Sequence, residues 1–230
     1  MNKIGILCAV DKELAPFLSC LQQATASQKA LLTFHEGTIG DRPVVILACG
    51  VGKTNAAIAA QILIDTYQVD AIINAGTAGG MDEALHIFDT VVATEVAHHD
   101  VAEGILTGSH PWLTSPFFSA DSQLLAWAAK AADHMDSAYA IHFGRMVTGE
   151  AFIADEGREA INTAYAPLSV DMETASMAQV CHANGVPFLS IRTITDTADH
   201  SGTGHFEENV AKASALSRDL VLALLTAAAA

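Results

Sequence analysis

The sequence predicts one three-layer α/β/α domain, with helices on both faces of a central, largely parallel, twisted mixed sheet. Short apolar runs typical of strands buried on both faces alternate with segments of helical periodicity. Several of these runs are followed directly by glycines or acidic residues, as at the ligand-binding edge of a parallel sheet. The 230 residues can bury a sizeable core, and no repeat or linker divides residues 1–230.

The first half of the chain supplies most of the predicted strands. Apolar runs predict strands at residues 4–9, 42–49, 71–75 and 89–97, with a weaker alternating strand at 33–39 before a Gly40-Asp41 turn. Helices are predicted between them, the first because apolar residues recur at helical spacing from Leu14 to Leu21. The second is expected from about residue 53 to residue 67.

The second half begins with a predicted loop at residues 101–118, which is rich in glycine and proline. Helices are then predicted at 119–135, 155–165 and 174–184 and from about 206 to 225. Strands are predicted at 141–147 and 188–194, and a further strand is predicted to end at Val170-Asp171, just before the helix at 174–184. Gly185 and Pro187 are typical of a helix end and close the helix at 174–184.

Composition excludes several classes of partner. The 11 basic and 26 acidic residues give a net charge of −15, which disfavours nucleic acid because phosphate backbones bind Lys and Arg clusters. The four cysteines show no CxxC spacing and fit buried thiols in a reducing cytosol. The first apolar run lacks a cleavage site, and the apolar tail at 220–230 is too short to span a bilayer. We therefore expect a cytoplasmic protein that does not bind membranes.

Three short motifs suggest chemistries that their surroundings do not support. The segment Gly50-Val51-Gly52-Lys53-Thr54 resembles a phosphate loop, but Leu47 stands where that pattern requires glycine. His98 and His99 would point to opposite faces of an extended segment, which disfavours a shared metal ion. No G-x-S-x-G elbow is present, and the neighbours Cys181 and His182 would not face each other on a helix.

Three acidic residues follow predicted strands and form the best candidate site: Glu13, Glu173 and Asp196. Each alone could be a solvated loop acid or a helix start. Together, at the carboxyl ends of strands in one sheet, they are expected to meet. One ionised carboxylate can accept both hydroxyls of a sugar diol. Cleavage of a glycosidic bond also requires a base for water and an acid for the leaving group.

Several motifs then occur in a fixed order along nearly the whole chain. They are Ile4-Gly5-Ile6 through Glu13, Gly50-Val51-Gly52-Lys53, Asn74-Ala75-Gly76-Thr77-Ala78-Gly79-Gly80, His99-Asp100, Thr148-Gly149-Glu150-Ala151-Phe152-Ile153, Val170-Asp171-Met172-Glu173, and Arg192-Thr193-Ile194-Thr195-Asp196-Thr197-Ala198-Asp199. In this order the chain resembles the bacterial 5′-methylthioadenosine/S-adenosylhomocysteine nucleosidases of the purine nucleoside phosphorylase superfamily.

The resemblance implies a nucleoside phosphorylase-like fold and hydrolysis of the N-glycosidic bond of both nucleosides, with no metal or organic cofactor. Glu13 would activate water, Asp196 would assist protonation of adenine N7, and Glu173 would accept the ribose hydroxyls. Met172 would pack on the sugar and Phe152 would stack on the base. The other implied substrate contacts are Ala9, Val51, Thr77, Ala78, Gly79, Ile153, Asp171, Arg192, Thr195, Ala198 and Phe206.

The implied acid role makes a physical demand on Asp196. A free aspartate has a pKa of about 3.9, so holding a proton near neutrality requires a shift of roughly three units. Burial against the purine and Phe152 could provide that shift. The alternative is that Asp196 stays ionised in the resting site and acts only as N7 gains its proton.

The residues after the predicted strands favour water over phosphate as the second substrate. A phosphate dianion is usually held by Arg side chains and backbone N–H groups. Residues 10–13 offer two acids and no arginine, and residues 74–80 offer no basic residue. We therefore predict hydrolysis to adenine and a 5-thio-substituted ribose.

The largest departure from the family pattern lies at residues 101–118. In the family this segment crosses to the partner subunit of a homodimer and lines the pocket for the 5′ substituent, so Leu106 and Trp112 are the candidates for that part here. Lys12 also interrupts an acidic run common in the family, and Val10 replaces a frequent methionine. The alternatives are a nucleosidase for another 5′-modified purine nucleoside, such as a futalosine-type substrate, a nucleoside phosphorylase, and a non-catalytic nucleoside-binding protein.

Overall fold

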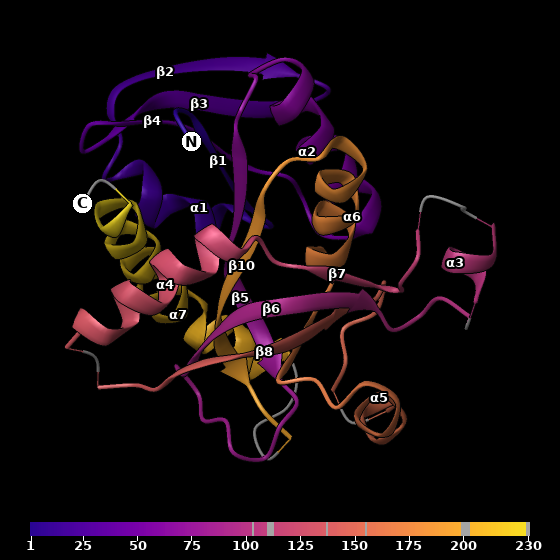
Figure 1. The fold of residues 1–230 in the computed structure, drawn as a ribbon. Helices are drawn as coiled ribbons and strands as arrows, with labels where there is room; N and C mark the ends of the chain where they lie inside the picture. Colours follow the sequence, from indigo (N-terminus) through magenta and orange to yellow (C-terminus); the bar gives the residue numbers. More distant parts are fainter. Residues whose placement is uncertain (103, 110–112, 137, 155, 199–202, 229–230) are drawn as a thin grey trace.

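The chain is built around one mixed sheet (Figure 1), and the computed structural model describes residues 1–102, 104–109, 113–136, 138–154, 156–198 and 203–228. The strands are β1 (Ile4–Cys8), β2 (Gln22–Lys29), β3 (Leu32–Ile39), β4 (Arg42–Ala48), β5 (Ala71–Gly80), β6 (Thr90–His98), β7 (Phe117–Ser119), β8 (Ile141–Thr148), β9 (Ser169–Asp171) and β10 (Phe188–Asp196). Their order is β10-β6-β8-β9-β5-β1-β4-β3-β2, with β7 beside β6. β1 is buried along its whole length because it runs parallel between β4 and β5.

Helices cover both faces of the sheet, which confirms the predicted three-layer α/β/α fold (Figure 1). They are α1 (Asp11–Leu18), α2 (Lys53–Asp65), α3 (Ile105–Ser109), α4 (Ser122–His134), α5 (Arg158–Tyr165), α6 (Thr174–Asn184) and α7 (Thr203–Ala227). One core packs α1, α4 and α7 against the sheet, and another packs α2 and α6. Within the described residues, no helix is both long and apolar enough to cross a membrane.

Part of the sheet closes on itself. β10 pairs in parallel with β5 and antiparallel with β6, while β9 joins β8 back to β5. Residues 76–80 and 195–196, which the sequence placed after strands, instead extend β5 and β10, because the register continues through Arg192↔Gly76 and Asp196↔Gly79. This register brings the Asp196 carboxylate beside the glycine-rich half of β5.

Three elements, β2, α3 and β7, were not predicted. All residues of β2 are exposed, so this edge strand carries no apolar pattern by which a strand can be recognised. The segment 101–118 is not a continuous loop, because it contains α3 and the start of β7. Phe118 is buried where it pairs with Val96 of β6, which explains why the chain becomes extended there.

The hairpin between β2 and β3 has an unfavourable turn sequence. Lys29 pairs with Leu32, so Ala30 and Leu31 form a two-residue turn with φ values of 50° and 65°. This left-handed conformation suits Asn and Gly rather than Ala and Leu. The Leu31 side chain is fully exposed, so its removal breaks no packing contact.

We expect the double variant Ala30→Asn, Leu31→Gly to raise the free energy of unfolding by about 1 kcal/mol, which is a Tm increase of about 2 to 4 °C. Thermal and urea unfolding would measure the change. The matched control is Gly40→Ala in the next hairpin turn. Gly40 has a φ of 57°, so this variant should shift stability in the opposite direction. A double variant less stable than the parent protein would contradict the turn assignment.

Candidate active site

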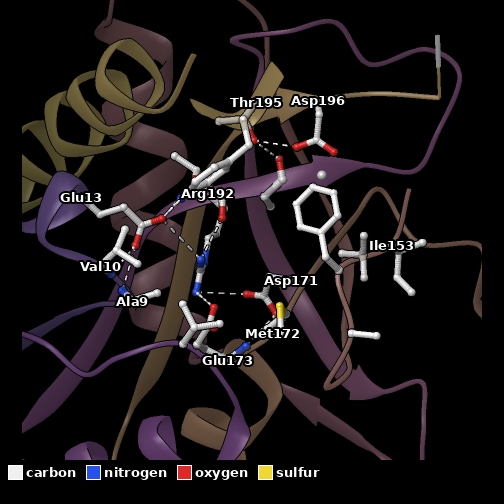
Figure 2. A pocket seen from close by; sticks show the side chains of 18 of the residues that line it. Ala9, Val10, Glu13, Ile153, Asp171, Met172, Glu173, Arg192, Thr195 and Asp196 are labelled. Carbon is white, nitrogen blue, oxygen red and sulfur yellow. Dashed lines mark hydrogen bonds and ion pairs between the residues drawn. The ribbon is translucent and has the colours of Figure 1, made fainter. Parts of the chain in front are cut away.

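A cavity of about 370 Å³ lies at the edge of the sheet where β1, β5, β9 and β10 end (Figure 2). This volume suits a small-molecule site. Its polar lining residues are Glu13, Thr77, Asp171, Glu173, Arg192, Thr195, Asp196 and Glu207. Its other lining residues are Ala9, Val10, Val51, Ala78, Gly79, Ala151, Phe152, Ile153, Val170, Met172 and Phe206. The cavity therefore combines a mostly apolar wall with a concentrated group of acids.

Arg192 of β10 lies at the centre of these acids and is almost completely buried. Its Nη2 atom lies 3.1 Å from Asp171 Oδ2 and 3.2 Å from Glu173 Oε2, and its Nη1 atom lies 3.8 Å from Glu13 Oε1. Burial opposes the charge, but the three carboxylates outweigh it and hold the pKa of Arg192 above its ordinary value. One cation thus balances acids from three separate parts of the chain.

The remaining donors of Arg192 are held by β5. Its Nε donates to Asn74 Oδ1 at 3.0 Å, and its Nη1 donates to the Thr77 carbonyl at 2.8 Å. The Asn74 Oδ1 atom also accepts a hydrogen bond from the Ser190 hydroxyl at 2.8 Å and lies 2.7 Å from Thr174 Oγ1. Because every polar group in this network is buried, their mutual hydrogen bonds fix the guanidinium in one orientation.

The Glu13 carboxylate is fixed at both oxygens. Its Oε2 accepts the Ala9 N–H at 2.8 Å, and its Oε1 accepts the backbone N–H and hydroxyl of Thr77 at 2.7 and 2.8 Å. The backbone of β5 can approach so closely because residue 76 is glycine: a Cβ there would lie 2.4 Å from Glu13 Oε1. The position of Glu13 therefore depends on Gly76 as well as on α1.

Glu173 is buried just before α6, with both oxygens directed to donors. Its Oε1 accepts the Gly52 N–H at 2.9 Å, and its Oε2 faces Arg192. Burial, with the nearby charges of Asp171 and Glu13, outweighs these donors and raises the pKa of Glu173 to about 7. Each oxygen keeps a free lone pair, so the ionised form can accept two hydroxyl groups from a ligand.

Asp171 lines the cavity as predicted, but its oxygens are engaged by the protein. Asp171 Oδ1 accepts the Thr148 hydroxyl at 2.5 Å and the Glu173 N–H at 3.3 Å. Its carboxylate also accepts the backbone N–H and the hydroxyl of Thr174, the first residue of α6. These contacts anchor the start of α6 and with it the neighbouring Glu173.

Asp196 lies apart from Arg192, on the other side of the cavity (Figure 2). Its Oδ1 accepts the Thr195 hydroxyl at 2.8 Å, whereas its buried Oδ2 has no hydrogen-bond partner. Burial raises the pKa of Asp196, and the Thr195 hydrogen bond only partly opposes that effect. A Cβ at Gly79 would lie 3.1 Å from Oδ2, so the glycine leaves room for this carboxyl group. Asp196 is therefore suited to hold a proton.

The structure brings nearly all the predicted site residues to this cavity. The exception is Ala198, which lies exposed in a turn after β10 and does not line the cavity. Two residues named in the sequence analysis, Trp112 and Asp199, lie outside the described residues. Leu106 packs against the core of its own chain.

Four lining residues were not predicted: Val10, Ala151, Val170 and Glu207. The first three directly adjoin predicted site residues, which is the signal that could have identified them. Glu207 comes from α7 and forms an ion pair with Lys12 of α1, a tertiary contact without a local sequence signal. In the described part of the chain, no group of three His, Cys, Asp or Glu side chains could hold a metal ion.

Comparison with known proteins gives a consistent picture. A family model described as the phosphorylase superfamily matches residues 3–226. A 5′-methylthioadenosine/S-adenosylhomocysteine nucleosidase from an Exiguobacterium species is 37% identical over 96% of this chain and 97% of its own.

Solved structures agree with this match. The Neisseria meningitidis nucleosidase of the same name, in complex with methylthio-immucillin-A, superposes with a TM-score of 0.90 at 28% identity. The alignment covers 98% of this chain and 99% of that one. The Colwellia psychrerythraea nucleosidase, in complex with adenine, also has a TM-score of 0.90 at 34% identity and covers 98% and 95% of the two chains.

The central role of Arg192 can be tested by its removal. We expect Arg192→Met to lower the free energy of unfolding by about 3 to 5 kcal/mol, because it leaves buried carboxylates without their cation. The loss should grow as the pH rises: without the cation the pKa of Glu173 rises further, so the folded state retains protons that the unfolded state releases. Urea unfolding between pH 5 and about 8 would measure both effects.

The matched control is Arg218→Met. Arg218 pairs with Asp219, whose side chain is 44% exposed, so its loss should cost no more than about 1 kcal/mol. Equal destabilisation by the two variants would contradict the central role of Arg192.

Proposed function

The chain belongs to the 5′-methylthioadenosine/S-adenosylhomocysteine nucleosidase family of the phosphorylase superfamily, and from this premise we propose that it hydrolyses the N-glycosidic bond of both nucleosides. The products are adenine and a 5-thio-substituted ribose. The observation that carries the proposal is the meeting of Glu13, Glu173 and Asp196 at one cavity, each in a different environment (Figure 2).

The purine occupies the side of the cavity near Asp196. Asp196 Oδ2 is free of protein hydrogen bonds and can pass a proton to N7 as the glycosidic bond breaks. Phe152 and Ile153 belong to the same cavity wall, and their apolar side chains suit the faces of a purine. Protonation of the base makes adenine a better leaving group.

The ribose lies between Glu173 and Glu13. Glu173 accepts the two ribose hydroxyls, and Met172 packs against the sugar. Glu13, oriented by Ala9 and Thr77, takes the proton of the attacking water. A ribose that loses its base develops positive charge, which three carboxylates around a single guanidinium favour electrostatically.

The same charges favour water over phosphate as nucleophile. Among the described residues that line the cavity, Arg192 is the only Lys or Arg, and its donors are engaged by Asn74, Thr77 and carboxylates. A phosphate dianion would therefore meet acids rather than an available cation. This arrangement supports a hydrolase rather than a phosphorylase.

We also expect a cytoplasmic homodimer in which residues 101–118 lie near the partner's cavity. The described part of this segment includes α3, which projects from the body of the chain (Figure 1). Ile105 of α3 is 53% exposed, which suits contact with a second copy.

The reaction can be tested by base release from 5′-methylthioadenosine, S-adenosylhomocysteine, adenosine, inosine and a futalosine analogue, each with and without phosphate. We expect adenine and free 5-thio-substituted ribose from the first two substrates, at rates independent of phosphate. Acceleration by phosphate with ribose 1-phosphate as product would identify a phosphorylase. Release from the futalosine analogue alone would identify another 5′-modified nucleoside as substrate, and no release at all would indicate a binding protein.

The role of Glu13 can be tested with Glu13→Gln. We expect kcat to fall by about 10²- to 10⁴-fold, because the amide cannot take a proton from water. Binding of a non-hydrolysable nucleoside analogue should persist, because the substrate contacts remain. Asp11→Asn is the control, since Asp11 is exposed on the same turn of α1 and should be dispensable. Undiminished turnover by Glu13→Gln would remove Glu13 from this role.

A further inference from the structure

We propose that the ion pair between Lys53 and Asp100 is a positioning device for the ribose: it holds the start of α2 so that the Gly52 N–H stays on Glu173. The inference rests on the proposed function, because it assigns Glu173 to the ribose hydroxyls. Neither Lys53 nor Asp100 lines the cavity, so both would act through Gly52.

The ion pair is part of a closed ring of contacts between three segments. Lys53 Nζ lies 2.7 and 2.8 Å from the two oxygens of Asp100, and Asp100 Oδ2 accepts the Glu150 N–H at 3.0 Å. The ring closes where Glu150 Oε1 accepts the backbone N–H of Lys53 at 3.2 Å. The turn after β6, the loop after β8 and the first residue of α2 are thereby fixed to one another.

Gly52 connects this ring of contacts to Glu173 in the cavity. It precedes α2 with a φ of 103°, a conformation accessible mainly to glycine, and donates its N–H to Glu173 Oε1 at 2.9 Å. On its other side, a Cβ at this position would lie 3.1 Å from Glu150 Oε2. Gly52 is thus enclosed between the carboxyl groups of Glu150 and Glu173. A backbone with so much intrinsic freedom keeps its direction only if its neighbours hold it.

The Gly52 N–H also affects the ionisation of Glu173. Its hydrogen bond lowers the pKa of Glu173 and so opposes burial, which raises it. The other groups that face Glu173 are Arg192 of β10, Asp171 of β9, Glu13 of α1 and Cys49 after β4. If the N–H drifts away, the pKa of Glu173 rises and the protonated form persists to higher pH. The protonated form cannot accept both hydroxyls. As the pH is lowered, nucleoside binding should therefore be lost at a higher pH than in the parent protein.

A merely structural ion pair would behave differently. The side chains of Lys53 and Asp100 are 19% and 27% exposed, so a purely structural pair would contribute a modest amount to stability. Its loss would lower stability slightly and would affect all substrates equally at every pH. The pH profile and the dependence on the ribose diol therefore separate positioning from simple stabilisation.

The experiment compares Lys53→Met with Lys53→Arg, which keeps the charge. We expect Lys53→Met to lower kcat/KM for 5′-methylthioadenosine about tenfold, the loss expected from one weakened charge-assisted hydrogen bond, mainly through a higher KM. The acid limb of its kcat/KM profile should move to higher pH. The loss should be smaller for a 2′,3′-dideoxy analogue, which offers Glu173 no hydroxyl. Lys53→Arg should retain the parent profile.

One further variant serves as a control, and a second tests the other partner of the ion pair. Lys29→Met removes a contact to Thr66 at the opposite end of the same helix, 2.7 Å from Lys29 Nζ, and should leave the acid limb in place. Asp100→Asn keeps an acceptor for the Glu150 N–H but loses the charge, so its acid limb should move in the same direction as that of Lys53→Met. An unmoved acid limb in Lys53→Met, or an equal loss for both substrates, would overturn the proposal.

The two proposals can fail separately. If the parent protein hydrolyses neither nucleoside, the proposed function fails, and the pH dependence is then read from binding of a non-hydrolysable nucleoside analogue with an intact ribose diol. Weaker binding by Lys53→Met at acidic pH would still support the positioning role. Identical binding curves for parent and variant would end it.

Discussion

The structure depends on a buried guanidinium surrounded by carboxylates. Glu13, Asp171 and Glu173 are each more than nine-tenths buried, which would be very costly without a cation or hydrogen bonds. Arg192 supplies that cation from the interior of β10 and links this strand to α1, β9 and the start of α6. The acids of the cavity and the connections between secondary-structure elements are therefore stabilised by the same charge.

Similar carboxyl groups acquire different chemistry from their surroundings. Glu13 receives backbone and hydroxyl donors at both oxygens, which suits a base held in one direction. Glu173 shares Arg192 and receives the N–H of Gly52, but its burial outweighs both donors and raises its pKa to about 7. Asp171 is saturated by Thr148 and Thr174 and serves as an anchor. In the sequence alone, these three acids look alike.

The sequence predicts the parts of the fold that repeat a simple pattern. Strands such as β1 and β4 were found because both faces are buried and the apolar run is continuous. β2 was missed because nothing buries it, and Glu207 was missed because α7 brings it to the cavity only in the folded chain. Asp171 illustrates a different limit of prediction from sequence. Its position in the Val170–Glu173 motif predicted that it lines the site, but only the structure shows that its oxygens already accept hydrogen bonds from the protein.

The environment of Asp196 favours the neutral acid, one of the two protonation states that the sequence left open. Its Oδ2 is buried and receives no hydrogen bond from the protein, so a charge there would be poorly stabilised. A proton on that oxygen removes the penalised charge and provides a donor inside the cavity. A purine covering the site would exclude water and favour the neutral acid further. Burial rather than a neighbouring charge therefore raises the pKa of Asp196, which supports its proposed role as the proton donor to N7.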